Sequence, residues 1–411
     1  MDNAARPPSA QTATRRTLIG IWAAWAAALL VFQAIVPMRL ELTRPDSALG
    51  WTPNETRRTS QNDKPYLVEP FLNAQVGWDS EFYLSIATAG YDDPLVRAVK
   101  AGGRMLSLNY AFFPGYPIAM AIAAWPIRWI GLTQIAGSTL GGVVVSLVAA
   151  LFAMFAIVEL TGKDPDNRAD GIRAATYLLI FPSGFFLAQV FTESLFLALA
   201  LWCLVFARRG NWLAAGALAI GVTLTRATGV ALVVPLAYLA WQAWDSAAGR
   251  ARVLSILAAA VPVIVFAAWR ISPLGQSFAA VEQAWFGREF LSIGKSFYNA
   301  YQAVVQMTSK NTQATIYFAL EFAAIALAAA GCIGVARRHP DIALFSAAVL
   351  VGSLTSGYIQ SMVRYTLTMP AMFFWLAQLG RRPAFDRGWS FASTLLLGML
   401  AMLFTFDMWV A

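Results

Sequence analysis

The sequence predicts an all-α, polytopic membrane protein, and three observations lead to this fold class. Hydrophobic residues make up 58% of the 411 residues and charged residues only 13%, which is about half the charged share of an ordinary soluble domain. Apolar runs recur along the chain, and we expect about 11 to 13 transmembrane helices from them. Arginines gather in short segments between these runs, which is the charge pattern of cytoplasmic turns.

The N-terminal region contains a polar tail and a first apolar run. Residues 1–16 are polar with interspersed proline and alanine, which predicts a disordered cytoplasmic tail. The run from Thr17 to Met38 is about long enough to cross a bilayer, and no clear small-residue cleavage site follows it. It therefore predicts a transmembrane helix and not a cleaved signal peptide. We expect residues 17–411 to form a single polytopic membrane domain.

Two long polar segments, residues 39–109 and 271–313, interrupt the apolar runs. The positive-inside rule and the alternation of spans place both segments on the extracytoplasmic side. Cytoplasmic turns are marked by Arg208-Arg209, Arg250 and Arg252, Arg337-Arg338, and Arg381-Arg382. When the spans are counted from each end of the chain, the two assignments of membrane sides differ by one span. We expect the run 131–160 to resolve it by forming two short helices, broken at Gly141-Gly142.

The composition excludes several classes of site. The single histidine, His339, lies in a cytoplasmic turn, and Cys203 and Cys332 both lie in apolar runs. This distribution gives no zinc constellation, no Cys/His nucleophile and no disulfide framework. The formal charge of +8 is explained by membrane topology and not by nucleic acid. With no glycine-rich phosphate loop after a strand, we expect no cofactor, metal or soluble nucleotide donor.

The stretch from Gly77 to Tyr91 places two carboxylates just outside the membrane. On a helix, Trp78, Phe82, Ile86 and Ala89 would share one face and Ser80, Glu81, Ser85 and Thr88 the other, a pattern typical of a helix on a membrane surface. Asp79 falls in the middle of the apolar arc, where an ionised carboxylate without a partner is costly. Two compatible interpretations remain open: Asp79 caps the helix N-terminus, or it faces a functional cavity.

Three further charged residues lie at span ends on the outer side. Glu193 opens a helix, so helix capping and cavity lining remain alternatives. Arg226 and Arg364 lie at outer span ends, where positively charged residues are statistically disfavoured. We therefore expect each of them to have an anionic partner. A lipid headgroup reached by snorkelling is one candidate. A substrate phosphate, gripped by the planar guanidinium, is the interpretation we favour.

The motifs occur in an order that resembles a known family. They are Trp78-Asp79, Phe82-Tyr83-Leu84, Gly90-Tyr91, Phe112-Phe113-Pro114, Tyr116-Pro117, Phe181-Pro182, Thr192-Glu193-Ser194, Thr225-Arg226, Thr228-Gly229 and Arg364-Tyr365. This succession looks like that of the GPI mannosyltransferase 2-like (PIG-V type) family, which has many bacterial members. It departs from the family in Gly77, where a basic or aromatic residue is common, and in Phe191, where tyrosine is common.

The resemblance implies the GT-C glycosyltransferase fold, with interfacial helices in the first outer loop. It implies transfer of a hexose, with mannose as the first choice, from a polyprenyl-phosphate carrier to a hydroxyl of a lipid, glycan or protein acceptor. The enzyme would lie in the cell inner membrane with its site facing the periplasm or exterior.

The resemblance also assigns roles to residues. Asp79 would be the catalytic base, with Glu81 or Glu193 as helpers, and Arg226, Arg364 and Tyr365 would hold the donor phosphate. The substrate cavity would include Trp78, Tyr83, Tyr110, Tyr116, Gln189 and Thr192. For the tyrosines, an interfacial aromatic belt is the alternative.

Two other functions compete with sugar transfer. A transporter or flippase of a lipid-linked saccharide predicts ionisable residues in mid-span and two related halves. The sequence places most of its charges at span ends and has no obvious halves. A non-catalytic subunit of another membrane enzyme is the second competitor, and only the placement of Asp79 and the arginines argues against it.

Overall fold

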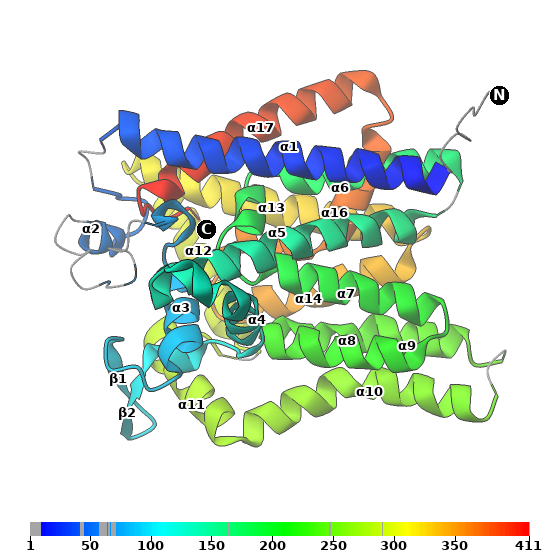
Figure 1. Cartoon of the computed structure of the whole chain (residues 1–411), viewed down its shortest axis with the longest axis horizontal. Helices are drawn as coiled ribbons and strands as arrows, with labels where there is room; N and C mark the ends of the chain where they lie inside the picture. Colours follow the sequence, from blue (N-terminus) through cyan, green and yellow to red (C-terminus); the bar gives the residue numbers. More distant parts are fainter. Residues whose placement is uncertain are drawn as a thin grey trace.

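The computed structural model describes residues 10–41, 45–56, 64, 66, 71–162, 164–245, 248–289 and 291–410. Within these ranges the regular secondary structure is helical apart from one antiparallel hairpin. In this hairpin Ala98 pairs with Ser107 and Ala101 with Arg104. Long helices lie side by side along the longest axis (Figure 1). The hairpin and several short helices gather at one end, and the described N-terminal residues begin at the other.

The elements follow one another in this order: α1 (Ala10–Arg39), α2 (Thr52–Glu55), α3 (Asp79–Ala89), β1 (Ala98–Ala101), β2 (Arg104–Ser107), α4 (Gly115–Ala124), α5 (Gln134–Thr161), α6 (Pro165–Ile180), α7 (Glu193–Arg208), α8 (Trp212–Thr225), α9 (Val233–Gln242), α10 (Arg250–Ile271), α11 (Pro273–Val281), α12 (Ile293–Met307), α13 (Thr312–Val335), α14 (Pro340–Leu354), α15 (Met362–Tyr365), α16 (Pro370–Leu379) and α17 (Pro383–Thr405). A π-helical turn, Glu282–Phe286, follows α11.

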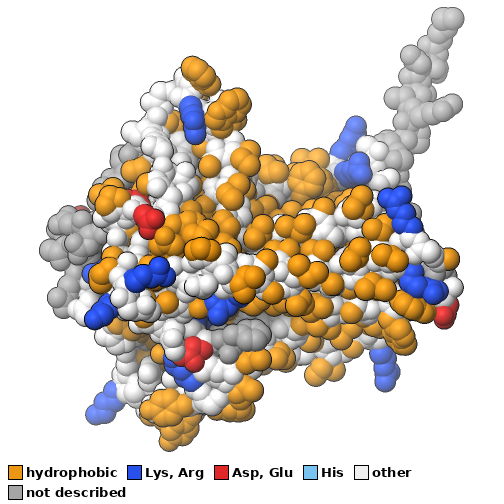
Figure 2. All heavy atoms as spheres, turned by 90° about the horizontal axis from the view of Figure 1, so that it is seen from below, with side chains coloured by type: hydrophobic (Ala, Val, Ile, Leu, Met, Phe, Trp, Pro, Cys, Tyr) orange, Lys and Arg blue, Asp and Glu red, His pale blue; other side chains and the backbone are white. Residues whose placement is uncertain are grey.

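Five helices of the described chain are long and apolar enough to cross a membrane. They are α1, α5, α10, α13 and α17. Shorter apolar helices, among them α8, α14 and α16, pack beside them. In the space-filling view, hydrophobic side chains cover the middle of the molecule and charged ones lie towards its ends (Figure 2). The predicted all-α polytopic membrane fold is thereby confirmed, whereas the predicted number of spans is not.

The expected break at Gly141-Gly142 is wrong, because α5 runs unbroken through both glycines. The glycines serve close helix packing instead. A Cβ on Gly141 would lie 2.8 Å from the carbonyl oxygen of Met120, and one on Gly142 would lie 3.2 Å from Val190. Helix α4 has 10 residues, about 15 Å of rise, which is too short to cross.

Both long polar segments contribute to the same end of the molecule. Helices α2 and α3 and the hairpin come from the first segment and α12 from the second, and Figure 1 shows them together. At the N-terminal end of the described chain, α1 already begins at Ala10. Residues 10–16 are thus helical although the tail was expected to extend to residue 16, because alanine and arginine favour the helix once α1 is nucleated.

Helix α3 packs differently from the surface helix that its pattern predicts. Ser80 and Ser85, expected on the polar face, are buried together with Tyr83 and Leu84. The Ser85 hydroxyl donates to Asp93 Oδ2 at 2.7 Å and accepts from Asn109 Nδ2 at 2.7 Å. Because this hydrogen bonding offsets the cost of burying a hydroxyl, a small polar residue can face the protein interior here.

Candidate active site

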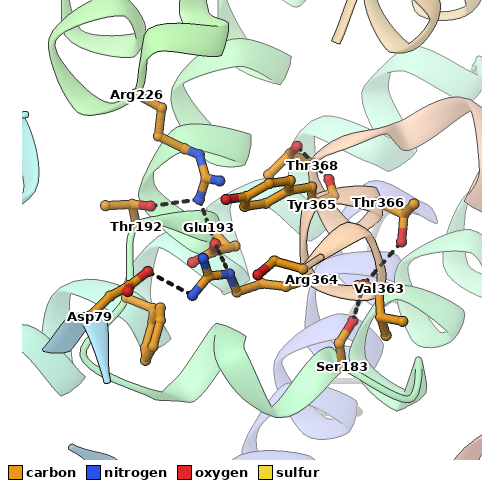
Figure 3. A network of polar contacts seen from close by, with 12 residues as sticks. Asp79, Ser183, Thr192, Glu193, Arg226, Val363, Arg364, Tyr365, Thr366 and Thr368 are labelled. Atoms are coloured by element: carbon orange, nitrogen blue, oxygen red, sulfur yellow. Dashed lines mark hydrogen bonds and ion pairs between the residues drawn. The ribbon is translucent and has the colours of Figure 1, made fainter. Parts of the chain in front are cut away.

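A chain of ion pairs joins four parts of the sequence at the end of the helices where the two long polar segments gather. Asp79 Oδ2 lies 2.8 Å from Arg364 Nη1, and Arg364 Nε lies 3.5 Å from Glu193 Oε1. The same Glu193 oxygen pairs with Arg226 Nη1, which also donates to Thr192 Oγ1 at 2.8 Å. Figure 3 shows these side chains converging from α3, the start of α7, the end of α8 and α15.

Asp79 is placed by an unusual backbone conformation. Trp78, the residue before α3, has φ 53° and ψ −114°, a conformation that costs a non-glycine residue about 1–3 kcal/mol. Asp79 is the first helical residue and not the cap, and the N-terminus carries no side-chain cap. Its side chain instead reaches Arg364. The capping interpretation of Asp79 is therefore wrong.

Arg364 is held by a carboxylate that the sequence reasoning missed. Glu321, buried in α13, accepts the backbone N–H of Ser361 at 2.6 Å and of Val363 at 2.7 Å. The Ser183 hydroxyl donates to the carbonyl of Val363 at 2.6 Å. These bonds fix the short helix α15 that carries Arg364. The available signal was a lone acid inside an apolar span, which is rarely placed there without a purpose.

Arg226 is placed by a tight chain reversal after α8. A Cβ on Gly229 would lie 2.6 Å from the Cα of Thr223 and 2.7 Å from the carbonyl oxygen of Val222, so only glycine fits. Its carboxylate partner, Glu193, is the first residue of α7 and makes no cap hydrogen bond. The side chain of Glu193 is fully buried, and its Oε2 has no hydrogen-bond partner among the described residues.

Aromatic rings surround the two arginines. The Cζ of Arg226 lies 5.1 Å and that of Arg364 5.3 Å from the centre of the Tyr365 ring. Arg364 also lies 5.2 Å from the Phe191 ring and 5.6 Å from the Phe186 ring. Cation–π contacts of this kind strengthen when water is excluded, so the rings help to keep buried guanidinium groups in place.

Glu81 belongs to a neighbouring cluster and not to this network. Its Oε1 lies 3.8 Å from Lys64 Nζ, which also pairs with Asp407 at 3.0 Å and Glu55 at 3.9 Å. Two positions after Asp79 on a helix, its side chain points about 200° away. Burial raises the pKa of Glu81 to about 8, although Lys64 opposes the shift. The structure therefore separates the two acids that the sequence places side by side.

The uncharged residues expected at the substrate site divide into two groups. Thr192, expected in the cavity, and Tyr365, expected at the donor phosphate, contact the network. The others have different partners: Tyr83 packs against Phe112 and Phe191, Tyr116 donates to the carbonyl of Gly142 at 3.0 Å, Tyr110 donates to Asp92 at 2.9 Å, Gln189 donates to Gln33 at 2.8 Å, and Trp78 contacts Trp51 and Trp409. Tyr83 and Tyr116 are buried, and their place in a substrate cavity stays a prediction.

Exposure separates the two carboxylates of the network. The Asp79 side chain is 19% exposed and that of Glu193 is 0% exposed. Asp79 is therefore the acid that an incoming molecule can reach, whereas Glu193 holds Arg226 and Arg364. Either arginine can donate to a phosphate, for which the guanidinium fork is well suited.

Fold and network together define a polytopic membrane protein with an acid–arginine site at one end of its helices. Residues 29–292 match the family described as Mannosyltransferase (PIG-V), and the chain belongs to this family. This confirms the resemblance recognised in the motifs.

Relatives with assigned names align over part of the chain. GPI alpha-1,6-mannosyltransferase 2 of Mus musculus is 29% identical over 161 residues, and that of Rattus norvegicus is 31% identical over 163 residues. Each alignment covers 38% of this chain and 30% of the relative, so the matched region is less than a third of either relative.

Two solved structures are similar over most of this chain. ArnT from Cupriavidus metallidurans bound to undecaprenyl phosphate has a TM-score of 0.44 at 16% identity and covers 92% of this chain and 62% of its own. AglB from Archaeoglobus fulgidus, in complex with an inhibitory peptide and a dolichol-phosphate, has a TM-score of 0.38 at 12% identity and covers 93% and 55%.

Proposed function

We propose that this protein is a membrane mannosyltransferase. It would move a hexose, mannose in the first place, from a polyprenyl-phosphate carrier to an acceptor hydroxyl. Membership of the Mannosyltransferase (PIG-V) family supports the reaction class. The observation that carries the proposal is the reachable acid Asp79 held 2.8 Å from Arg364, with Arg226 on the other side of Glu193.

The chemistry requires few groups. The acceptor oxygen attacks the anomeric carbon, and the bond from that carbon to the phosphate oxygen breaks with its electron pair leaving on the phosphate. Asp79 takes the proton of the acceptor hydroxyl, a contribution of about 10² to 10⁴ in rate. Arg226 and Arg364 stabilise the leaving phosphate, so no general acid is needed. Direct displacement inverts the anomeric centre, so a β-linked donor gives an α-linked product.

Donor binding would also prepare the base. In the structure Asp79 Oδ2 is occupied by the Arg364 guanidinium, and an oxygen engaged in this way is a poor proton acceptor. A donor phosphate offers Arg364 an alternative partner. As Arg364 turns towards the phosphate, Asp79 becomes available to the acceptor hydroxyl.

The position of the site suits a lipid carrier. The network lies at the end of the long helices where both polar segments gather, and the positive-inside rule makes this the outer end. A carrier can keep its tail in the bilayer while its sugar phosphate reaches the interface. We place the enzyme in the inner membrane with the site facing the periplasm or exterior, and the acceptor is a lipid, glycan or protein.

The test is transfer by the purified protein in detergent. A polyprenyl-phosphate mannose is supplied with candidate acceptors, and the parent is compared with Asp79→Asn. We expect the variant to lose at least about 10² in rate, while donor binding persists. Asp166→Asn, on an exposed acid at the opposite end, is the control. Equal turnover by parent and Asp79→Asn would remove Asp79 from the mechanism and favour a transporter or a scaffold.

A further inference from the structure

A third arginine reaches the ring on which Arg226 and Arg364 rest. The Cζ of Arg288 lies 5.2 Å from the centre of the Tyr365 ring. The corresponding distances are 5.1 Å for Arg226 and 5.3 Å for Arg364. Because all three measure from one point, no two guanidinium carbons lie farther apart than twice 5.3 Å. The oxygens of one phosphate group point to different sides, so such a group can contact guanidinium groups that lie on different sides of it.

Arg288 comes from the second outer segment, and several bonds hold it there. Its Nη1 donates to Ser356 Oγ and its Nη2 to the carbonyl of Gln360, both at 3.2 Å. The backbone N–H of Glu289 donates to the carbonyl of Ser356 at 3.0 Å. The preceding Gly287 has φ 63°, and a Cβ there would lie 2.7 Å from the Tyr358 ring. Arg288 is thus placed by a specific turn and not by a loose loop.

The charges around Arg288 differ from those around the other two arginines. Arg226 pairs with Glu193 and Arg364 with Asp79. The hydrogen-bond partners of Arg288 are a hydroxyl and a carbonyl, and within the described part of the chain no carboxylate oxygen lies within 4.0 Å of it. Glu282 lies nearby, but burial raises its pKa to about 7, with Arg288 opposing the shift and Asp79 adding to it. Burial therefore favours the uncharged form of Glu282.

We propose that Arg288 is a third ligand of the donor phosphate, and that the three arginines around Tyr365 form a socket for one phosphodiester group. This inference rests on the proposed function. Glu193 and Asp79 pair with two of the three guanidinium groups, and the third has no ion-pair partner among the described residues. A sugar phosphodiester carries one negative charge, which this third guanidinium can meet.

The same arrangement favours the leaving group. When the bond between the anomeric carbon and the phosphate oxygen breaks, its electron pair stays on the phosphate, which then carries a second negative charge. A cation without its own carboxylate partner responds most strongly to this change, because no internal ion pair has to break. Arg288 would therefore stabilise the transition state more than the bound donor.

The experiment measures binding of a short-chain polyprenyl phosphate to the full-length protein in detergent. We expect Arg288→Gln to weaken binding by about tenfold or more, the usual loss for one hydrogen bond to a charged group. Arg288→Lys should lie between parent and Arg288→Gln, since lysine keeps the charge but not the fork. In the transfer assay Arg288→Gln should also lower kcat, with a smaller loss for Arg288→Lys.

Lys310→Gln is the matched control. Lys310 is an exposed lysine of the same polar segment, so its replacement removes one positive charge without changing a residue of the turn that carries Arg288. We expect its affinity for the phosphate to stay within about twofold of the parent, because an exposed charge contributes little. Equal loss in Lys310→Gln and Arg288→Gln would overturn the inference, because the general loss of positive charge would then explain both.

Two outcomes separate this inference from the proposed function. If the parent itself binds no polyprenyl phosphate, the proposed function fails. If the parent binds it and Arg288→Gln binds it equally well, only the role of Arg288 is lost. Should Arg288→Gln fold poorly, the ranking of parent against Arg288→Lys decides, since an unchanged affinity and kcat in the lysine variant would contradict a forked phosphate contact.

Discussion

Arg364 contacts Asp79 and Glu193 at the same time, with its Nη1 2.8 Å from one carboxylate and its Nε 3.5 Å from the other. One guanidinium group thus joins the acid that solvent can reach to the acid that is fully enclosed. The arrangement makes the first long polar segment and the start of α7 depend on a residue of α15.

Removing this guanidinium should weaken donor binding. We expect Arg364→Gln to weaken binding of a polyprenyl phosphate by about tenfold or more, because a charge-assisted contact is lost. Arg226→Gln should behave in the same direction. Equilibrium binding to the purified proteins measures both effects. Unchanged affinity in both variants would undo their assignment to the donor phosphate.

Glu321 should act through the position of Arg364. Its carboxylate accepts two backbone N–H groups at the start of α15. Glu321→Gln replaces one acceptor oxygen by a donor, so we expect the free energy of unfolding to fall by about 1–3 kcal/mol. Thermal unfolding measured beside donor affinity checks this. Glu289→Gln, on an exposed acid, should leave both quantities unchanged.

The turn after α8 should not tolerate a side chain. In Gly229→Ala the new Cβ would meet the backbone of Thr223 at 2.6 Å, so the chain carrying Arg226 must shift. We expect lower stability and weaker phosphate binding. Gly137→Ala, in helix α5 with nothing within 4 Å of the added Cβ, should instead be neutral or stabilising by up to about 1 kcal/mol. A loss of equal size in both variants would contradict the steric argument.

Glu81 predicts a pH dependence of stability. Its folded-state pKa of about 8 lies above its ordinary value of 4.5, so the protonated form favours the folded state. That contribution is fully present below about pH 4.5 and is lost as pH rises through about 8. We expect Glu81→Gln to unfold at a higher temperature than the parent at pH 9, with the difference shrinking towards pH 5. A constant difference would contradict it.

Orientation can be tested by labelling. In intact cells a membrane-impermeant maleimide should modify Asp92→Cys, in the first outer segment, and should not modify Asp166→Cys until the membrane is opened. Both aspartates are exposed, so protein packing does not explain a difference between them. The reverse pattern would place the site in the cytoplasm.

The sequence was sufficient for the fold class and for singling out three charged residues that the structure brings together, and the reason is physical. Apolar length and arginine placement follow directly from the bilayer. Asp79, Arg226 and Arg364 were recognisable because each lies where its charge is unfavourable without a partner. Their pairing through Glu193 could not be predicted, since it depends on how helices distant in sequence pack.

Two other features could not be predicted, also because they depend on how segments distant in the sequence pack. Gly141-Gly142 looked like a helix break, but glycine also permits close helix contact, and only the position of α4 decides between the two. Arg288 lay in a polar segment with other charges, and nothing local linked it to Tyr365. The cavity roles of Tyr83 and Tyr116 stay predictions, because aromatic rings suit both sugars and packed interiors.

The contact between Trp78 and Trp409, with ring centres 4.8 Å apart, has a consequence for biosynthesis. Trp78 Nε1 also donates to the carbonyl of Met408, a bond across 330 positions. While the ribosome is still making the protein, the backbone just before Asp79 lacks this support. We therefore expect nascent chains halted before Met408 to insert into the membrane yet remain inactive until the final helix and the residues after it have emerged.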